Sequence, residues 1–185
     1  MVNSPGGNTI AAAEHTIAMM LALSRNIPIA NSSMFEGKWE RKKFVGNELF
    51  KKKLGVVGLG KIGTHVAKVA NAMGMEVLGY DPFVSNERAQ QLQVKLSELD
   101  ILFQDSDYVT LHLPRTVETE NLVDIKVLKS MKNTAKLINC ARGGIIDEEA
   151  LAEALNNSLI GGAAIDVYSD CLLYTSDAAD DRMRV

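Results

Sequence analysis

The spacing of apolar residues changes along the chain, and each change marks a different kind of segment. Over residues 7–26 the apolar positions recur at helical spacing, with Asn8 or Thr9 as the expected N-cap and Pro28 just beyond the end. Residues 32–53 are polar, glycine-punctuated and weakly periodic, which predicts a loop or an extended arm. The N-terminal part is therefore expected to hold one helix followed by an irregular segment.

From residue 53 onward, short apolar runs alternate with amphipathic segments. We expect strands over 53–60, 75–82, 108–114, 135–141 and 161–167, helices over 61–74, 87–92, 123–133 and 147–157, and a short strand with a helix over 94–107. Strands that alternate with helices form parallel sheets joined by right-handed crossovers. The predicted fold class is α/β, a Rossmann-like doubly wound parallel sheet.

Composition and charge narrow the class of protein without changing this picture. The 185 residues carry a net charge of −3, with 46% hydrophobic and 23% charged, as expected of one soluble globular domain with room for a fragment of a second. No signal peptide or membrane span is visible, and the slight acidity gives no reason to expect nucleic acid or membrane as a partner. Cys140 and Cys171 have no CxxC spacing, so we expect a cytoplasmic protein without a disulfide framework or a metal site.

The strongest motif is the glycine-rich segment VVGLGKIG, which follows a predicted strand and opens a predicted helix. In such a turn Gly58 permits the tight bend, Gly60 lets a pyrophosphate approach the backbone, and Gly63 lets helix and strand pack closely. The free N–H groups of the helix N-terminus favour phosphate. A phosphate-binding P-loop is excluded, because Lys61 is not followed by Ser or Thr. The motif predicts a dinucleotide site.

Asp81 lies eighteen residues after Gly63, at the end of the second predicted strand. A carboxylate at this place accepts hydrogen bonds from the adenosine ribose and repels a 2′-phosphate, so NAD(H) is preferred over NADP(H). The alternative is a structural turn with a solvent-facing aspartate. We favour the cofactor, because the motif, its placement and the downstream acid agree.

Three later strands also end in residues that can do chemistry. Arg142 stands in a turn with Gly143 and Gly144 after it, where a planar guanidinium can bind a carboxylate and polarise a carbonyl. An ordinary surface arginine is the alternative. Cys140 is interpreted as a small buried side chain near the cofactor, because no partner base is evident to activate it.

The histidines and the last acid give weaker signals. His112 is a possible proton shuttle, although a packed, hydrogen-bonded histidine at a strand end is favoured. His15 and His65 lie within helical patterns and are interpreted as structural or surface residues. Asp166 ends an apolar strand and would be costly to bury without a donor, for which a nicotinamide carboxamide is one candidate.

Four segments, at residues 3–28, 37–63, 137–155 and 161–167, together resemble the D-isomer-specific 2-hydroxyacid dehydrogenase family. The resemblance covers about residues 2–168, and its most specific parts are the AEHT helix and the NCARGG turn. It is strongest to the members that oxidise 3-phosphoglycerate to 3-phosphohydroxypyruvate with NAD in serine biosynthesis. The implied partner is therefore a small 2-hydroxy acid, 3-phosphoglycerate, and the implied assembly is a homodimer or tetramer through the NAD-binding domain.

The resemblance also implies roles for individual residues. Positions that match the family's cofactor site are Gly58, Gly60, Lys61, Ile62, Gly63, Asp81, Leu113, Cys140, Ala141, Arg142 and Asp166. Arg142 matches the catalytic arginine, which orients the substrate carboxylate and polarises its carbonyl. Residues 3–8 resemble the interdomain stretch beside the substrate, which makes Asn3, Gly6 and Gly7 substrate-adjacent.

The family's domain organisation is only partly represented. Its cofactor domain is inserted between two halves of a substrate domain, so residues 1–7 would be an interdomain remnant and residues 8–170 an NAD-binding domain truncated at its C-terminal end. The family mechanism also needs a glutamate shortly after Asp166 and a later histidine. Cys171 stands about where the glutamate should be, and no histidine follows His112. We expect this fragment to bind NAD(H) weakly and to be inactive.

Residues 171–185 resemble no part of the family. The stretch CLLYTSDAAD is similar, over ten consecutive residues, to a translated sequencing-library adapter. We expect a gene fragment to end near Asp170 and the remainder to be a non-native, adapter-derived tail. A divergent natural tail is the alternative.

Two other functions stay open at this point. A related enzyme could use glyoxylate, hydroxypyruvate or D-lactate, and the difference would lie in a substrate pocket outside this sequence. A non-catalytic NAD-binding module of the corepressor kind could use the same fold, although Arg142 argues against it. The basic stretch at residues 38–53 is interpreted as a solvated face or a subunit contact rather than a polyanion site.

Overall fold

The computed structural model describes residues 7–169. Several expectations lie outside the described residues. They concern Asn3, Gly6, residues 1–6 of the expected remnant at 1–7, and the expected tail at 171–185.

Six parallel strands form a single sheet, as the alternating pattern predicts. They are β1 (Lys53–Val57), β2 (Glu76–Tyr80), β3 (Lys95–Leu96), β4 (Tyr108–Leu111), β5 (Lys136–Asn139) and β6 (Gly162–Ile165). Their order across the sheet is β3-β2-β1-β4-β5-β6, so the chain first winds outward from β1 to one edge and then returns to wind to the other. This is the doubly wound topology, and its switch point lies between β1 and β4.

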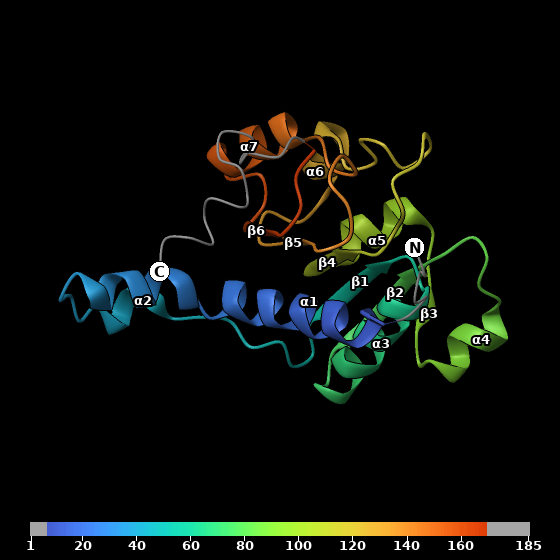
Figure 1. The fold of residues 1–185 in the computed structure, drawn as a ribbon, viewed down its shortest axis with the longest axis horizontal. Helices are drawn as coiled ribbons and strands as arrows, with labels where there is room; N and C mark the ends of the chain where they lie inside the picture. Colours follow the sequence, from blue (N-terminus) through green and yellow to red (C-terminus); the bar gives the residue numbers. More distant parts are fainter. Residues whose placement is uncertain (1–6, 170–185) are drawn as a thin grey trace.

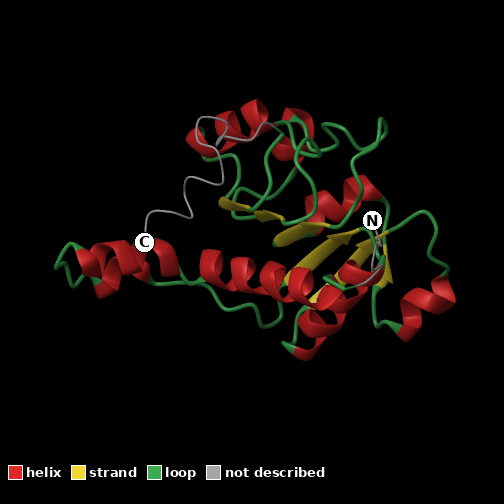
Figure 2. Ribbon diagram, in the orientation of Figure 1, coloured by secondary structure: helices red, strands yellow, loops and turns green. Residues whose placement is uncertain are grey.

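Helices cover both faces of the sheet (Figures 1 and 2). They are α1 (Thr9–Ser24), α2 (Ile27–Phe35), α3 (Lys61–Ala72), α4 (Asn86–Gln91), α5 (Leu99–Asp105), α6 (Ile125–Ser130) and α7 (Glu148–Asn156), with a 3₁₀ turn at Arg41–Phe44. On one face α1 and α3 pack side by side, and on the other α5, α6 and α7 follow one another. Among residues 7–169, no helix is both long and apolar enough to cross a membrane.

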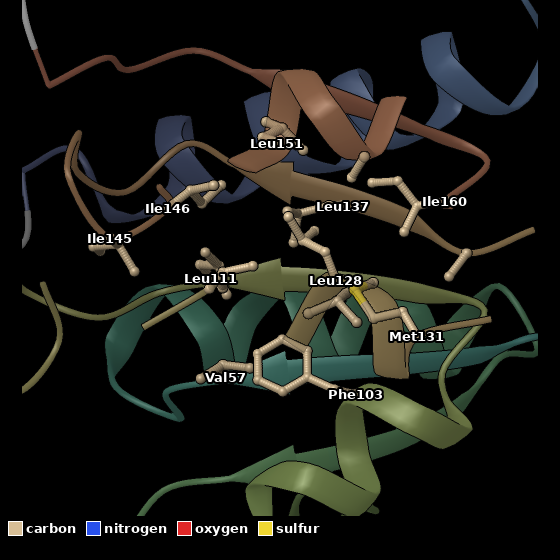
Figure 3. Close-up of a cluster of buried hydrophobic side chains, with 14 of the residues drawn as sticks. Val57, Phe103, Leu111, Leu128, Met131, Leu137, Ile145, Ile146, Leu151 and Ile160 are labelled. Carbon is tan, nitrogen blue, oxygen red and sulfur yellow. The ribbon is translucent and has the colours of Figure 1, made fainter. Parts of the chain in front are cut away.

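Each face of the sheet has its own hydrophobic core, because successive strand residues point to opposite sides. In β1, Leu54 and Val56 face the core under α1 and α3, whereas Val57 faces the core under α5, α6 and α7. The second core is shown in Figure 3, where Phe103 and Leu128 pack between the sheet and the helices. Burial on both faces explains the continuous apolar strand patterns in the sequence.

The expected loop at residues 32–53 is only partly correct. Residues 32–35 belong to α2 and residues 41–44 form the 3₁₀ turn, so the loop prediction is wrong there. Pro28 lies in the first turn of α2, where a missing N–H costs nothing and a fixed φ suits the helix. Asn26 adopts a left-handed conformation with φ 56° and separates α1 from α2. The apolar periodicity of this segment is therefore too weak to predict α2 from the sequence.

Two polar contacts hold the C-terminal end of α1 against the sheet. Lys136 is buried at the start of β5, and its Nζ donates to the carbonyl of Leu23 at 3.2 Å. The same ammonium lies 5.8 Å from the centre of the Tyr108 ring, and the Tyr108 and Ser24 hydroxyls are 3.0 Å apart. Burial lowers the pKa of Lys136. These contacts fix where α1 crosses β5 and β6.

The turn between β1 and α3 brings helix and strand unusually close together. Gly58 has φ +96°, which other residues rarely adopt, and a Cβ there would lie 2.7 Å from the His112 carbonyl oxygen. A Cβ on Gly63 would overlap the carbonyl oxygen of Gly58. A Cβ on Gly60 would meet nothing within 4 Å. Gly58 and Gly63 are therefore required by packing, whereas Gly60 faces open space.

This contrast predicts different losses of stability for two glycine substitutions. Gly63→Ala should lower the free energy of unfolding by about 2–3 kcal/mol, because the backbone of β1 and α3 has to separate. Gly60→Ala should change it by less than about 1 kcal/mol, because its φ of −66° suits alanine and no atom is displaced. Urea unfolding of both variants measures this, and equal destabilisation would show that the close contact at Gly63 is not required.

Candidate functional site

The register of the sheet places four of the predicted cofactor-site residues in one row, together with His112. Val57 pairs with Tyr80 and Leu111, Leu111 pairs with Asn139, and Asn139 pairs with Ile165. One residue further along each strand, at the carboxyl edge, the row reads Asp81, Gly58, His112, Cys140 and Asp166, from β2 to β6. Neighbouring strands are about 4.8 Å apart, so these residues span the edge of the sheet where doubly wound folds bind ligands.

The glycine turn that begins at Gly58, next to Asp81 in this row, is suited to phosphate. Lys61 and Ile62 are the first residues of α3, which begins directly after the glycine turn and points its N-terminus at the carboxyl edge. The partial positive charge of this N-terminus favours a pyrophosphate, and the open space at Gly60 lets one approach. Leu113 is half-buried and its side chain packs against the Gly58 side of the turn.

Asp81, at one end of the row, is held by two backbone groups. Its carboxylate accepts a hydrogen bond from the Leu59 N–H at 2.8 Å and another from the Phe83 N–H at 2.9 Å. The first bond ties the end of β2 to the glycine turn after β1. Each carboxylate oxygen has a second lone pair for further donors. Asp81 is therefore oriented beside the turn, where its charge disfavours a 2′-phosphate.

The loop after β5 is shaped by a residue that the sequence interpretation did not single out. Asn139 is buried, and its side chain accepts from the Ala141 N–H and donates to the Arg142 carbonyl, both at 3.0 Å. The available signal was an asparagine just before a turn, where its amide can replace backbone partners. Asn139 thus holds the segment that presents Ala141 and Arg142 at the edge.

Arg142 lies exposed on this loop. Its Nη1 donates to the Ala141 carbonyl at 2.6 Å, which leaves most of its five N–H donors for other partners. Within residues 7–169 its guanidinium pairs with no carboxylate. A planar cation in this state is suited to a substrate carboxylate.

The other end of the row holds Cys140 and Asp166. Burial, opposed by a Thr16 hydrogen bond, raises the pKa of the Cys140 thiol, so the protonated thiol is the form at neutral pH and a nucleophilic role is disfavoured. Asp166 is not buried among apolar groups but exposed, and its carboxylate lies 3.2 Å from Nε2 of His15. His15, on α1, was interpreted only as a structural or surface residue. Helical periodicity could not reveal this neighbour, because α1 and β6 are far apart in sequence.

His112 is packed rather than positioned as a proton shuttle. Its Nε2 lies 3.0 Å from the Thr110 hydroxyl. Burial lowers the pKa of His112 to about 4, so the imidazole is neutral at physiological pH. The structure therefore agrees with a hydrogen-bonded histidine at the end of β4.

Comparison with known proteins identifies the family of the chain. Residues 17–178 match the NAD binding domain of the D-isomer specific 2-hydroxyacid dehydrogenases. The chain belongs to this family. NAD is accordingly the cofactor of the domain, as the glycine turn and Asp81 predict.

Several similar proteins are named D-3-phosphoglycerate dehydrogenase. The chain is 62% identical to the one from Synechocystis over 91% of its length, and 54% identical to the one from Archaeoglobus fulgidus over 91%. It spans 30% and 32% of the length of these relatives. A crystal structure of D-lactate dehydrogenase from Aquifex aeolicus with NAD and lactic acid matches with a TM-score of 0.83 at 34% identity, covering 88% of this chain and 49% of that one.

The neutral His112 predicts a pH dependence of stability in this dehydrogenase domain. The unfolded imidazole takes up a proton near pH 6.5, but the folded one does so only near 4. Above pH 6.5 His112 is neutral in both states and does not lower the free energy of unfolding. As the pH falls from 6.5 towards 4, protonation of the unfolded imidazole lowers this free energy. Between pH 7 and pH 5 the loss is about 2 kcal/mol.

The measurement is urea unfolding of the chain and of His112→Gln at these two pH values. The variant keeps a polar group beside Thr110 but cannot titrate, so its loss between the two pH values should be smaller by about 2 kcal/mol. Equal losses in both proteins would show that His112 is not held neutral.

Proposed function

We propose that this chain is the cofactor domain of an enzyme that oxidises 3-phosphoglycerate to 3-phosphohydroxypyruvate, with NAD as the acceptor. The observation that carries the proposal is the combination of an exposed Arg142 beside the nicotinamide end of the row with 62% identity to a D-3-phosphoglycerate dehydrogenase. The D-lactate dehydrogenase structure is only 34% identical, which disfavours a lactate-type substrate.

The order of the edge residues supports the binding of a different part of the cofactor by each of them. Asp81 would bind the adenosine ribose, the glycine turn and the α3 N-terminus would bind the pyrophosphate, and Cys140, Ala141 and Asp166 would surround the nicotinamide. This order follows the strands, because the turn after β1 lies between β2 and β4 in the sheet. Leu113, after β4, would face the middle of the cofactor.

In the proposed reaction the bound cofactor would supply the hydride acceptor for C2 of the substrate, and the C2 hydroxyl would lose a proton as its oxygen becomes a carbonyl. Arg142 would bind the substrate carboxylate through its guanidinium fork and stabilise the charge that develops on the C2 oxygen. The proton acceptor is expected outside the described residues. His112 is unsuited to this role, because burial lowers its pKa to about 4, which makes it a weak base, and its Nε2 is bonded to Thr110.

The test is an activity assay of the full-length protein that contains this domain. We expect NAD-dependent oxidation of 3-phosphoglycerate with a higher kcat/KM than for D-lactate or glycerate, and lower activity with NADP. Arg142→Lys, which keeps the charge but loses the planar fork, should lower kcat/KM by about 100-fold. Arg88→Lys on α4 is the matched control and should leave it unchanged.

Preference for D-lactate over 3-phosphoglycerate would overturn the substrate assignment. Binding of NADH without any turnover by the full-length protein would favour the non-catalytic module instead. The 185-residue chain alone is expected to bind NADH weakly and not to turn over.

The assembly is proposed to be at least a homodimer through α1, α2 and the segment after α2. In Figure 1 α2 projects beyond the sheet. This projection exposes several large apolar side chains: Ile27 (53%), Ile29 (57%), Met34 (52%), Phe35 (86%) and Trp39 (74%). Such a concentration on one projecting element is typical of a surface that a second copy covers.

Size-exclusion chromatography with light scattering tests this assembly. Phe35→Glu combined with Trp39→Glu should weaken self-association at least about tenfold, because both side chains would leave the contact. Val117→Glu, an equally exposed apolar position elsewhere at 89%, is the control and should have no effect. A monomeric unmodified chain at high concentration would refute the contact.

The cytoplasm is the proposed location, since Cys140 carries a free thiol.

A further inference from the structure

Three side chains with metal-binding atoms meet at one end of the cofactor edge. His15 Nε2, Cys140 Sγ and a carboxylate oxygen of Asp166 all lie within 4.8 Å of one another. We propose that this His–Cys–Asp cluster binds a soft divalent cation such as Zn²⁺, and that the bound cation blocks the nicotinamide end of the NAD site. The sequence predicts no metal site, because the three residues are separated along the chain by more than any usual ligand spacing.

The donor set is suited to zinc. Zn²⁺ accepts imidazole nitrogen, thiolate sulfur and carboxylate oxygen in tetrahedral sites. Around such an ion a nitrogen and an oxygen ligand are about 3.4 Å apart, and a sulfur and a nitrogen about 3.6 Å, from the usual bond lengths. His15 and Asp166 are already 3.2 Å apart, and Cys140 has to close at most about 1.2 Å by rotation of its side chain.

The three donors are carried by rigid neighbouring elements. Cys140 and Asp166 each follow a strand, and those strands are paired in register from Lys136 with Gly162 to Asn139 with Ile165. His15 is on α1, which contacts β5 and β6 and is anchored at its end by Lys136. Little conformational freedom is therefore lost on binding, which favours affinity.

The cluster has the character of an open site rather than a structural one. Three protein ligands leave one position for water, and His15 and Asp166 are both exposed, so a cation can enter from solvent. On binding, the Cys140 thiol releases its proton to solvent and the thiolate bonds to the metal. No oxidation or reduction is involved.

The blocking effect rests on the proposed function, because it requires Cys140 and Asp166 to surround the nicotinamide. A cation held between these residues would occupy the space and the carboxylate that the carboxamide needs. Zn²⁺ and NADH would then exclude one another.

Cobalt titration of the 185-residue chain tests the site directly, without any cofactor. Co²⁺ is the probe, because it follows zinc coordination and gives an absorption band when a thiolate is a ligand. We expect one Co²⁺ per chain with this band, and its displacement by Zn²⁺. The band should disappear in Cys140→Ser, and the affinity should fall at least about tenfold in His15→Ala.

Two matched controls make the result specific. Cys171→Ser removes the chain's other cysteine and should leave the band intact. His65→Ala removes a histidine of α3 and should leave the affinity intact. A band that survives Cys140→Ser but is lost in Cys171→Ser would overturn the site, as would the absence of any thiolate band.

NADH fluorescence then tests the blocking step separately. Zn²⁺ should lower the apparent affinity for NADH in the unmodified chain at least about tenfold, but not in His15→Ala. Unchanged NADH affinity in the presence of bound Zn²⁺ would overturn the blocking step. A chain that binds Co²⁺ but no NADH would contradict the proposed function and leave the metal site standing.

Discussion

The cofactor edge depends on the contact between two glycine backbones in the turn after β1. Because Gly63 has no side chain, the first turn of α3 can rest against the Gly58 carbonyl, and the helix N-terminus is held at the end of the central strand. Asp81 adds a second tie through the Leu59 N–H. If the helix stood further from the strand, its N–H groups and the carboxylate would no longer point to one ligand.

Parallel pairing then determines which residues share the site. All strands run in one direction, so the residue that follows each strand arrives at the same edge, and the register sets their order from Asp81 to Asp166. The same edge carries a carboxylate, a helix N-terminus and, on the loop after β5, an exposed arginine.

Burial, rather than the identity of a residue, decides which groups can do chemistry here. His112 and Cys140 have reactive side chains, but burial makes the imidazole a weaker base and raises the pKa of the thiol. Arg142 is on an exposed loop that Asn139 shapes, so its charge remains usable. His15 lies beside Asp166 and Cys140 because Lys136 and Tyr108 hold α1 over β5 and β6.

The sequence by itself determined the class of fold, the glycine turn, the position of Asp81 after the second strand and the arginine loop. These depend on local patterns: apolar periods, glycines at a strand–helix junction, and polar residues directly after strands. It failed for α2, whose short apolar period is weak and whose Pro28 suggested a break. Only the tertiary structure brought His15 to Asp166 and Cys140, and showed that Asn139 supports the loop of Arg142. Such contacts join α1, β5 and β6 across long stretches of chain, and they arise from packing and register, for which local patterns carry no signal.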